Sequence, residues 1–212
     1  PVVKGMESRI RKFALVILGV TTFGATGVQA SLLSPGSSIS LSSEAEPAGA
    51  ALVTTLAVPF AAPTFSGTLI TTVWSGDTSN PFGGLTFTYQ LSNNAVSPDP
   101  LDRFTLSSYA GFQTDVSYFG AGIVPTSAVR NPSGNQISFN FTGPFQGTLT
   151  PAASSPLLII QTGSAGYQNS LAGVINSSSV NVATLAPLAV PEPTTAVLLT
   201  LGALSLVVRR KS

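Results

Sequence analysis

LTFTYQL, residues 85–91, alternates apolar and polar side chains without a break. A period of two is the signature of a β-strand with one face in a core and the other toward solvent. Tyr89 falls in phase with Leu85 and Phe87, so we expect its ring to pack in the core. Residues 137–141 repeat the pattern and predict a second strand of the same kind.

Further strand candidates lie on both sides of this stretch, each rich in β-branched or aromatic residues. They are residues 68–74, 104–108, 114–119, 157–161 and 180–185. The run LLII at 157–160 is apolar throughout, which is typical of a central strand covered on both faces. Between the two ends of the chain, only residues 170–175 suggest a single turn of helix.

The breaks between these strands carry turn chemistry, with Gly, Pro, Asn and Asp clustered at 75–81, 97–100, 131–134 and 142–144. Seven to ten short strands without a long helix predict an all-β fold, a single jelly-roll-like β-sandwich over residues 51–186. Residues 31–50 are Ser-rich and weakly patterned, so we expect them to form a leader into this domain. The strands do not repeat at a fixed period, which argues against a solenoid or propeller.

The chain contains neither Cys nor His. Disulfides and thiolate chemistry are therefore absent. The usual general base and the commonest metal ligand are missing as well. This excludes the ordinary catalytic triads and the zinc sites of hydrolases, and we expect no cofactor and no metal site.

Basic residues are concentrated at the two ends of the chain. Seven of the nine Lys and Arg lie in residues 1–12 and 209–211. Between residues 31 and 190 only Arg103 and Arg130 are basic, against six acidic residues, which gives this part a net charge of −4. Phosphate binding needs clustered cations, so a nucleic-acid partner is excluded.

The first 30 residues have the layout of a cleavable secretory signal, expected as a helix. Met6 is the expected start, and Arg9, Arg11 and Lys12 form the positive region before the apolar stretch 13–23. Val28 and Ala30 then supply small residues at the −3 and −1 positions. The pattern predicts cleavage after Ala30 by signal peptidase.

The last residues, 187–212, combine a rigid turn, an uncharged run and a basic end. Pro191 and Pro193 hold Glu192 in extended backbone, the form that a protease-like active site can grip. Residues 194–208 would span about 22 Å as a helix, short of the ~30 Å hydrocarbon core. The closing basic cluster would stay on the cytoplasmic side and stop the helix in the membrane. It consists of Arg209, Arg210 and Lys211.

This tail resembles the PEP-CTERM sorting signal, found in Gram-negative bacteria that make exopolysaccharide. The resemblance rests on Pro191-Glu192-Pro193, on Leu-Gly at 201–202 and on the closing Arg-Arg-Lys. It implies recognition by an exosortase, a membrane-embedded cysteine transpeptidase-like enzyme, with processing near Pro191–Pro193. The chain would be a substrate that reaches the cell surface or extracellular matrix after transient inner-membrane anchoring.

Three Asp residues are candidates for catalysis in the body. Asp99 and Asp102 share one loop and Asp115 lies a strand away, and two carboxylates at a defined separation can hydrolyse a glycosidic bond. The alternative is structural, with Asp99 capping a turn between two prolines and Asp102 pairing with its neighbour Arg103. Loop aspartates usually take such structural roles, so we expect no catalysis.

Two binding candidates lie near residue 75. Asp77, Thr78, Ser79 and Asn80 could offer oxygens to Ca²⁺, but Asp77 is the only carboxylate of this loop and an Asx-type turn is favoured. Trp74 ends a strand beside the loop and is the best candidate for stacking on a sugar ring. The alternative for Trp74 is a buried anchor of the core.

The sequence therefore predicts an exported, non-catalytic protein with a structural or adhesive role in the exopolysaccharide of a biofilm matrix. The alternative is a carbohydrate-binding module for matrix polysaccharide, and a third reading is a glycoside hydrolase that uses the three Asp residues. The expected partners are signal peptidase and exosortase during export, the membrane around the C-terminal transmembrane helix, and exopolysaccharide.

Overall fold

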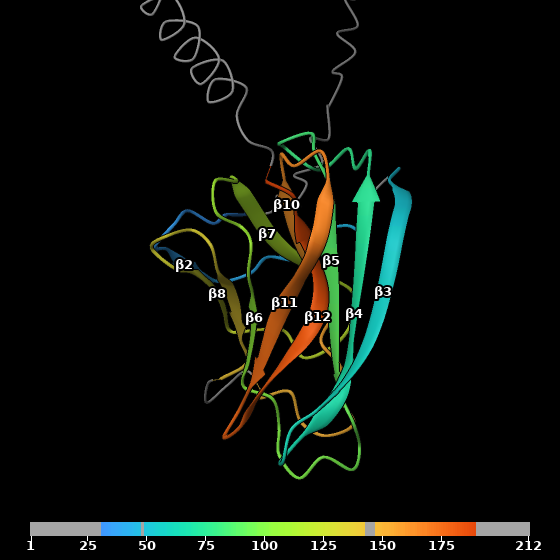
Figure 1. The fold of residues 1–212 in the computed structure, drawn as a ribbon, viewed down its shortest axis with the longest axis vertical. Helices are drawn as coiled ribbons and strands as arrows, with labels where there is room; N and C mark the ends of the chain where they lie inside the picture. The colour runs from blue at the N-terminus through green and yellow to red at the C-terminus, as the bar shows by residue number, and fades with distance from the viewer. Residues whose placement is uncertain (1–30, 48, 143–146, 190–212) are drawn as a thin grey trace, which may run out of the picture.

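Twelve strands in the described part of the chain form two six-stranded antiparallel sheets that pack face to face (Figure 1). This part of the computed structural model comprises residues 31–47, 49–142 and 147–189. It contains no helix, so the prediction of an all-β sandwich is confirmed. The chain crosses repeatedly between the two sheets, as the order of their strands shows.

The first sheet has the order β1-β7-β10-β5-β4-β3. Its strands are β1 (Ser31–Leu32), β7 (Thr114–Phe119), β10 (Leu157–Thr162), β5 (Thr86–Asn93), β4 (Ser66–Ser75) and β3 (Ala51–Ala61). The second sheet has the order β12-β11-β6-β9-β8-β2. Its strands are β12 (Ser179–Pro187), β11 (Tyr167–Ile175), β6 (Arg103–Leu106), β9 (Ile137–Asn140), β8 (Ser127–Arg130) and β2 (Ser38–Ile39).

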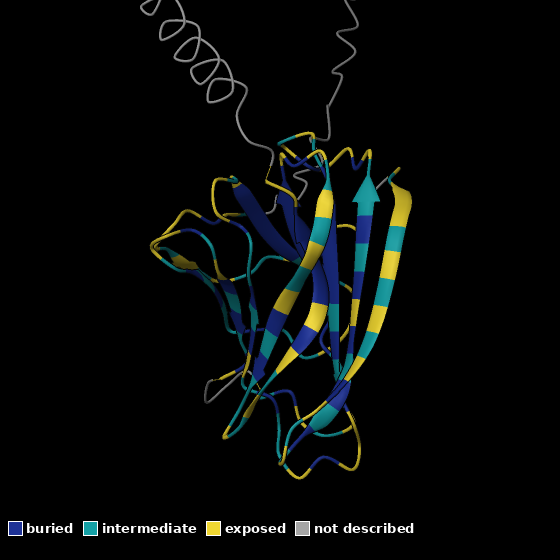
Figure 2. Cartoon of the chain, viewed as in Figure 1, coloured by how far each residue is buried: buried dark blue, intermediate teal, exposed yellow. Residues whose placement is uncertain are grey.

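The core lies between the sheets and follows the period-two pattern of the sequence. Phe87, Tyr89 and Leu91 of β5 are fully buried, as the phase of their strand predicts. The expectation that the other face of this strand meets solvent is wrong, because Thr86 and Thr88 are buried as well. The ring of Phe104 in β6 packs against Tyr89 from the opposite sheet, with ring centroids 5.8 Å apart. Edge strands such as β3 keep the alternation of exposed and half-buried residues that one-sided packing produces (Figure 2).

β10 is buried on both faces, as its apolar run predicts. It pairs with β7 on one side and with β5 on the other. Leu158 and Ile160 point into the sandwich, while Ile159 on the outer face is also buried. The outer face of the first sheet is thus covered around Ile159 of β10.

The predicted turn of helix at 170–175 is wrong, because these residues belong to β11. β11 pairs with β12 over its whole length and with β6 over residues 172–175. Exposed and buried side chains alternate along it. Pairing on both edges of β11, with β12 in a hairpin and with the distant β6, outweighs the weak local preference of a short Ser, Leu and Ala segment.

The expected leader at 31–50 contributes to both sheets. β1 pairs with β7, and β2 pairs with β8. Leu33, between these two short strands, is fully buried in the core. The core therefore uses residues from upstream of position 51.

The predicted signal peptide at 1–30 lies outside the described residues, as do the Pro-Glu-Pro motif, the apolar run 194–208 and the basic end 209–211. Within the described ranges, no helix has the length and apolar character needed to cross a membrane.

Candidate functional site

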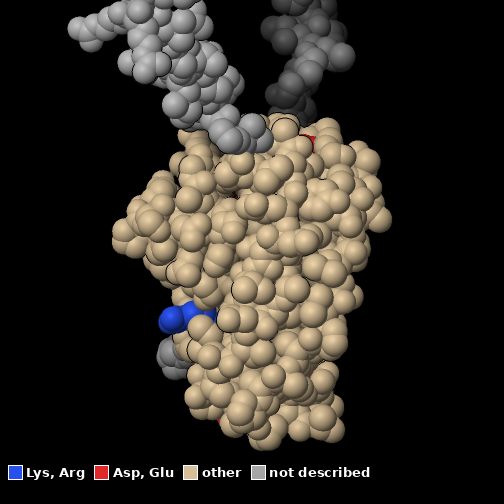
Figure 3. Space-filling model, viewed as in Figure 1, with Lys and Arg blue, Asp and Glu red and all other residues tan. Residues whose placement is uncertain are grey.

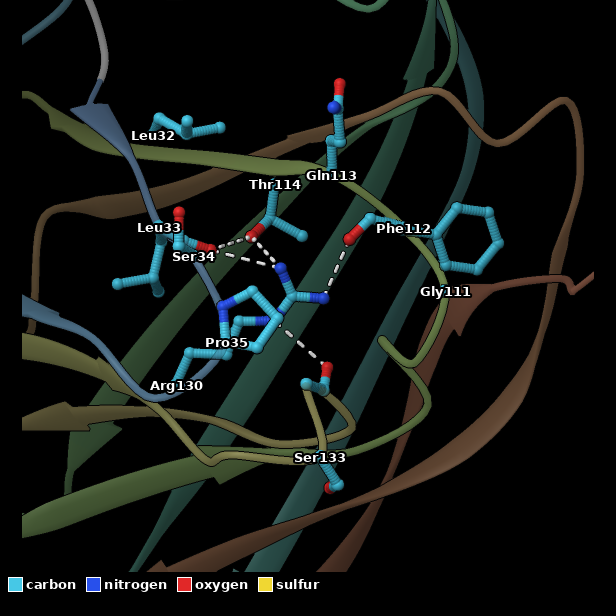
Figure 4. Close-up of a pocket in the computed structure, with 11 residues that line it drawn as sticks. Leu32, Leu33, Ser34, Pro35, Gly111, Phe112, Gln113, Thr114, Arg130 and Ser133 are labelled. Carbon is cyan, nitrogen blue, oxygen red and sulfur yellow. Dashed lines mark hydrogen bonds between the residues drawn. The ribbon is translucent and has the colours of Figure 1, made fainter.

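A pocket of about 350 Å³ opens at the end of the sandwich where the turn at 111–112 meets the segment 32–35 (Figure 4). A second hollow of the same end lies between this turn, residues 163–165 and the last described residues, Leu188 and Ala189. The first and the last described residues therefore lie at one end of the sandwich, on either side of Phe112.

Arg130 forms part of the wall of the first pocket, although only 2% of its surface is exposed. Its five N–H groups all donate hydrogen bonds. Figure 4 shows those to Leu33, Phe112, Thr114 and Gly134. The acceptors are the carbonyl oxygens of Gly134 (3.0 Å), Leu33 (3.0 Å), Tyr109 (2.8 Å) and Phe112 (2.7 Å), and Oγ1 of Thr114 (3.0 Å).

Because each donor of Arg130 is used internally, the guanidinium is not available to an anionic ligand in the pocket. Through these bonds Arg130 connects its own strand β8 with Leu33, with residues 109–114 and with the turn at 131–134. Burial lowers the pKa of this guanidinium from its ordinary value. The arrangement is a structural one.

Two tyrosines form a second buried polar contact. The hydroxyl of Tyr89 donates to the carbonyl oxygen of Leu185 (2.8 Å), and the hydroxyls of Tyr89 and Tyr109 lie 2.6 Å apart. Since the Tyr89 proton is used on Leu185, Tyr109 donates to Tyr89. Burial is the main cause that raises the pKa of both hydroxyls, so neither is ionised at neutral pH.

A third polar group, here called the Gln161 cluster, covers the outer face of the first sheet at the same end. It consists of Glu44, Asp77, Ser79, Thr86, Ser117 and Gln161. Asp77 forms an Asx turn, in which Oδ1 accepts from the backbone N–H (3.0 Å) and hydroxyl (2.7 Å) of Ser79. Its Oδ2 accepts from the hydroxyl of Thr86 (2.7 Å).

Glu44 joins this cluster from the segment that follows β2. Its Oε2 accepts from the hydroxyl of Ser117 (2.5 Å), and its Oε1 lies 3.3 Å from Nε2 of Gln161. Glu44 and Gln161 are 117 positions apart in the chain. No local sequence pattern connects them, so the contact could not be predicted.

Asp115 is the next acidic residue beside the cluster, and it lies opposite Gln161 in the ladder between β7 and β10. Its Oδ1 accepts from the backbone N–H of Val116 (3.1 Å). Burial raises the pKa of Asp115 to about 6, and the charge of Glu44 acts in the same direction.

The structure does not bring the three candidate catalytic carboxylates together. Asp115 shares a rung of the first sheet with Thr86, whereas Asp99 follows the far end of β5, where Asn93 donates to its carbonyl oxygen. The seven steps of strand from Thr86 to Asn93 span about 23 Å at ~3.3 Å per residue. Glycosidase carboxylates lie roughly 5–10 Å apart, so Asp115 is too far away to pair with Asp99.

Asp99 and Asp102 remain neighbours and both take part in the structure of their loop. Oδ2 of Asp99 accepts from the hydroxyl of Ser177 (3.0 Å). The backbone of Asp102 donates to Ile175 (3.0 Å) and accepts from Phe141 (2.7 Å). Burial, followed by the charge of Asp99, raises the pKa of Asp102.

Trp74 is half-buried on the outer face of the first sheet, near the end of β4. Its ring Nε1–H donates to Oγ1 of Thr88 (3.0 Å). The cross-strand partner of Trp74 on β3 is Leu52, which is 61% exposed. With Ile70 and Ala57, which also pair on this face and are exposed, these residues form an uncharged strip along the β3–β4 hairpin.

The comparison with protein families gives one match. A family model described as "PEP-CTERM protein-sorting motif" matches residues 189–211. The match begins directly after Leu188, two residues beyond the end of β12. No curated protein and no solved structure matches the chain. The motif identifies an exported protein that an exosortase processes and sorts to the cell surface.

Proposed function

We propose that the chain is a non-catalytic structural or adhesive component of the exopolysaccharide matrix, held briefly in the inner membrane before exosortase releases it. The observation that carries the proposal is the position of the sorting motif. It starts at residue 189, immediately after the last strand of a sandwich whose core contains residues from both ends of the described chain.

The distance from the sandwich to the processing motif supports this reading. Three residues separate the end of β12 at Pro187 from Pro191, and the four steps between these prolines span at most about 14 Å when fully extended. Cleavage near Pro191–Pro193 would therefore leave almost nothing beyond the sandwich. Whatever the mature protein does, it does with the surface of the two sheets.

The surface of the sandwich is suited to many weak contacts with neutral polymers. The face over β11 and β12 is almost free of charged side chains (Figure 3). Its outward residues include Asn169, Leu171, Asn181 and Ala183, all exposed. Amides and small apolar groups can hydrogen-bond and pack against hydroxyl-rich polymers without needing counter-ions.

Replacing Pro191, Glu192 and Pro193 together by Ala tests the sorting part of the proposal. We expect the variant to accumulate in the membrane fraction at its unprocessed mass, while the wild-type chain is released. The matched control replaces Pro151 and Pro156 by Ala, since these prolines lie in the sandwich and outside the motif. Release of the motif variant at the wild-type rate and mass would refute exosortase processing at this site.

A second candidate function, binding of matrix polysaccharide, is favoured by the strip that contains Trp74. The half-buried indole of Trp74, next to exposed Leu52 and Ile70, offers a flat apolar platform of the kind that stacks on sugar rings. In a pull-down with the producer's own polysaccharide, Trp74→Ala should lose binding and Tyr167→Ala, on the other sheet, should keep it. Equal binding by both variants would remove this candidate.

A further inference from the structure

Four apolar side chains gather at the end of the sandwich where the first and the last described residues lie. They are Leu32, Phe82, Phe112 and Leu188, and each of the other three shares a hollow with Phe112. Leu32 is 57% exposed and Leu188 39% exposed, while the two phenylalanines are half-buried. Figure 4 shows the ring of Phe112 pointing away from the guanidinium of Arg130, which contacts its carbonyl oxygen. These four residues form what is here called the Phe112 end.

The loops that form the Phe112 end carry no charged residue. They are residues 32–36, 79–84, 108–113, 163–166 and 188–189. Of the carboxylates close to this end, Asp77 and Asp115 are buried, and half-buried Glu44 accepts from Ser117. A surface without exposed charge can approach a bilayer that contains anionic lipids without repulsion and without the cost of desolvating a charge.

The sorting motif limits how far the Phe112 end can lie from a membrane that holds the tail. Residues 194–208 would span about 22 Å as a helix against a hydrocarbon core of ~30 Å, so none of this run is left over as a spacer. The seven steps from Pro187, where β12 ends, to Thr194 cover at most about 25 Å. The headgroup region takes up roughly 5–8 Å of that distance. The Phe112 end is therefore kept close to the lipid surface.

A second tether is predicted at the same end. Leu32 lies two residues beyond Ala30, after which we expect the signal peptide to be cleaved. Leu32 and Leu188 line hollows on either side of Phe112. Two membrane segments attached at one end turn that end toward the bilayer, whereas tethers at opposite ends would lay the sandwich on its side.

We propose that the Phe112 end docks on the lipid headgroup region of the membrane that holds the tail, an inference that rests on the proposed anchoring of the chain. Phe and Leu side chains of membrane-surface segments are buried about 5–10 Å into the boundary between headgroups and acyl chains. Docking holds Pro191, Glu192 and Pro193 at the membrane surface. A membrane-embedded exosortase can reach the motif there.

Quenching by brominated lipids tests whether a single Trp lies in the membrane boundary. Trp74 is the only Trp of the chain, so Trp74→Phe gives a background without one. In this background the full-length Phe112→Trp chain is placed in vesicles of phosphatidylethanolamine and phosphatidylglycerol. It should lose most of its emission when phosphatidylcholine brominated in the upper part of its acyl chains is included.

The matched control is Val96→Trp in the same background, because Val96 is 86% exposed and lies at the opposite end of the sandwich. Its turn follows β5, and the backbone N–H of Asn94 donates to Ser66 at the start of β4. The Val96→Trp chain should keep nearly all of its emission. Circular dichroism checks that each variant is folded.

A charge placed at the Phe112 end should lift this end from the lipid. Phe82→Trp is the second probe, and it also replaces Phe112→Trp if that chain fails to fold. Adding Phe112→Asp to the Phe82→Trp chain should restore most of the emission, because a carboxylate is costly to desolvate and is repelled by anionic lipid. Val96→Asp adds the same charge at the opposite end and should leave the quenching unchanged.

Equal quenching of the Phe112→Trp and Val96→Trp chains overturns docking, and it leaves the proposed anchoring in place if the chain floats with the vesicles. A chain that does not float with the vesicles refutes the anchoring and the docking together. Phe112→Asp could also slow exosortase processing in cells although neither probe is quenched in vesicles. The Phe112 end would then contact the enzyme and not the lipid, and this outcome also overturns the proposal.

Discussion

Arg130→Met should be among the most destabilising single substitutions in the sandwich. The change removes five hydrogen bonds and leaves the carbonyl oxygens of Leu33, Tyr109, Phe112 and Gly134 without this donor. Losing the donor to a buried acceptor costs about 1–3 kcal/mol. Removing the buried charge itself recovers part of that loss, because the guanidinium no longer needs to be desolvated.

The net loss in the free energy of unfolding should be about 3–4 kcal/mol, toward the low end of what breaking a buried charged network costs. For a domain of this size that corresponds to a fall in Tm of roughly 10 °C. Thermal unfolding followed by circular dichroism measures it. The control is Arg103→Met, because Arg103 is exposed and its Nε–H makes one bond, to Asn140 (2.8 Å), worth at most about 1 kcal/mol.

Equal, small losses in Tm for Arg130→Met and Arg103→Met would refute the argument that Arg130 ties the four segments together. A large loss for Arg130→Met alone, partly restored in Arg130→Lys by its remaining donors, agrees with it. Lys cannot reach all five acceptors, because its ammonium is compact and carries three hydrogens.

Four further substitutions test other contacts by urea unfolding. Gly84→Ala should lower the free energy of unfolding by about 2 kcal/mol, because a Cβ would lie 2.5 Å from the carbonyl oxygen of residue 162. The control Gly147→Ala, where the Cβ would meet open space, should lower it far less. Tyr89→Phe should lower the free energy of unfolding by about 2 kcal/mol and Tyr109→Phe by about 1 kcal/mol, because only the hydroxyl of Tyr89 both donates and accepts a hydrogen bond. Equal losses would contradict the assigned donors. Asp115 has a pKa raised from 3.8 to about 6 in the fold, so its contribution to stability is present below about pH 4 and is lost as the pH rises through 6. Asp115→Asn should abolish this loss of stability with rising pH. A variant with the same dependence of stability on pH as the wild-type chain would refute the assignment to Asp115.

The main strands were predictable because their pattern is local. Leu85 to Leu91 alternate with a strict period of two, and both β5 and β10 lie where their apolar patterns predict. β11 was missed because Ser170 to Ile175 carry no strong strand pattern. Its structure depends on pairing with β6, which is distant in the sequence, and with β12, which follows it.

The polar sites were predictable only in part, because some of their contacts are local in the sequence and others join distant residues. The Asx turn of Asp77 depends on Ser79, two residues away, and a turn was expected there. Glu44 and Gln161 meet across 117 positions, and no spacing rule connects such residues. Arg130 did give a signal, since it is one of only two basic residues in an otherwise Lys-free body.

The intact mass of the protein recovered from the extracellular fraction tests the central claim, export followed by exosortase processing, most directly. The account predicts a chain that begins at Ser31 and ends between Val190 and Pro193, without the apolar run and the basic end. A released protein whose mass still includes residues up to Ser212 would contradict it.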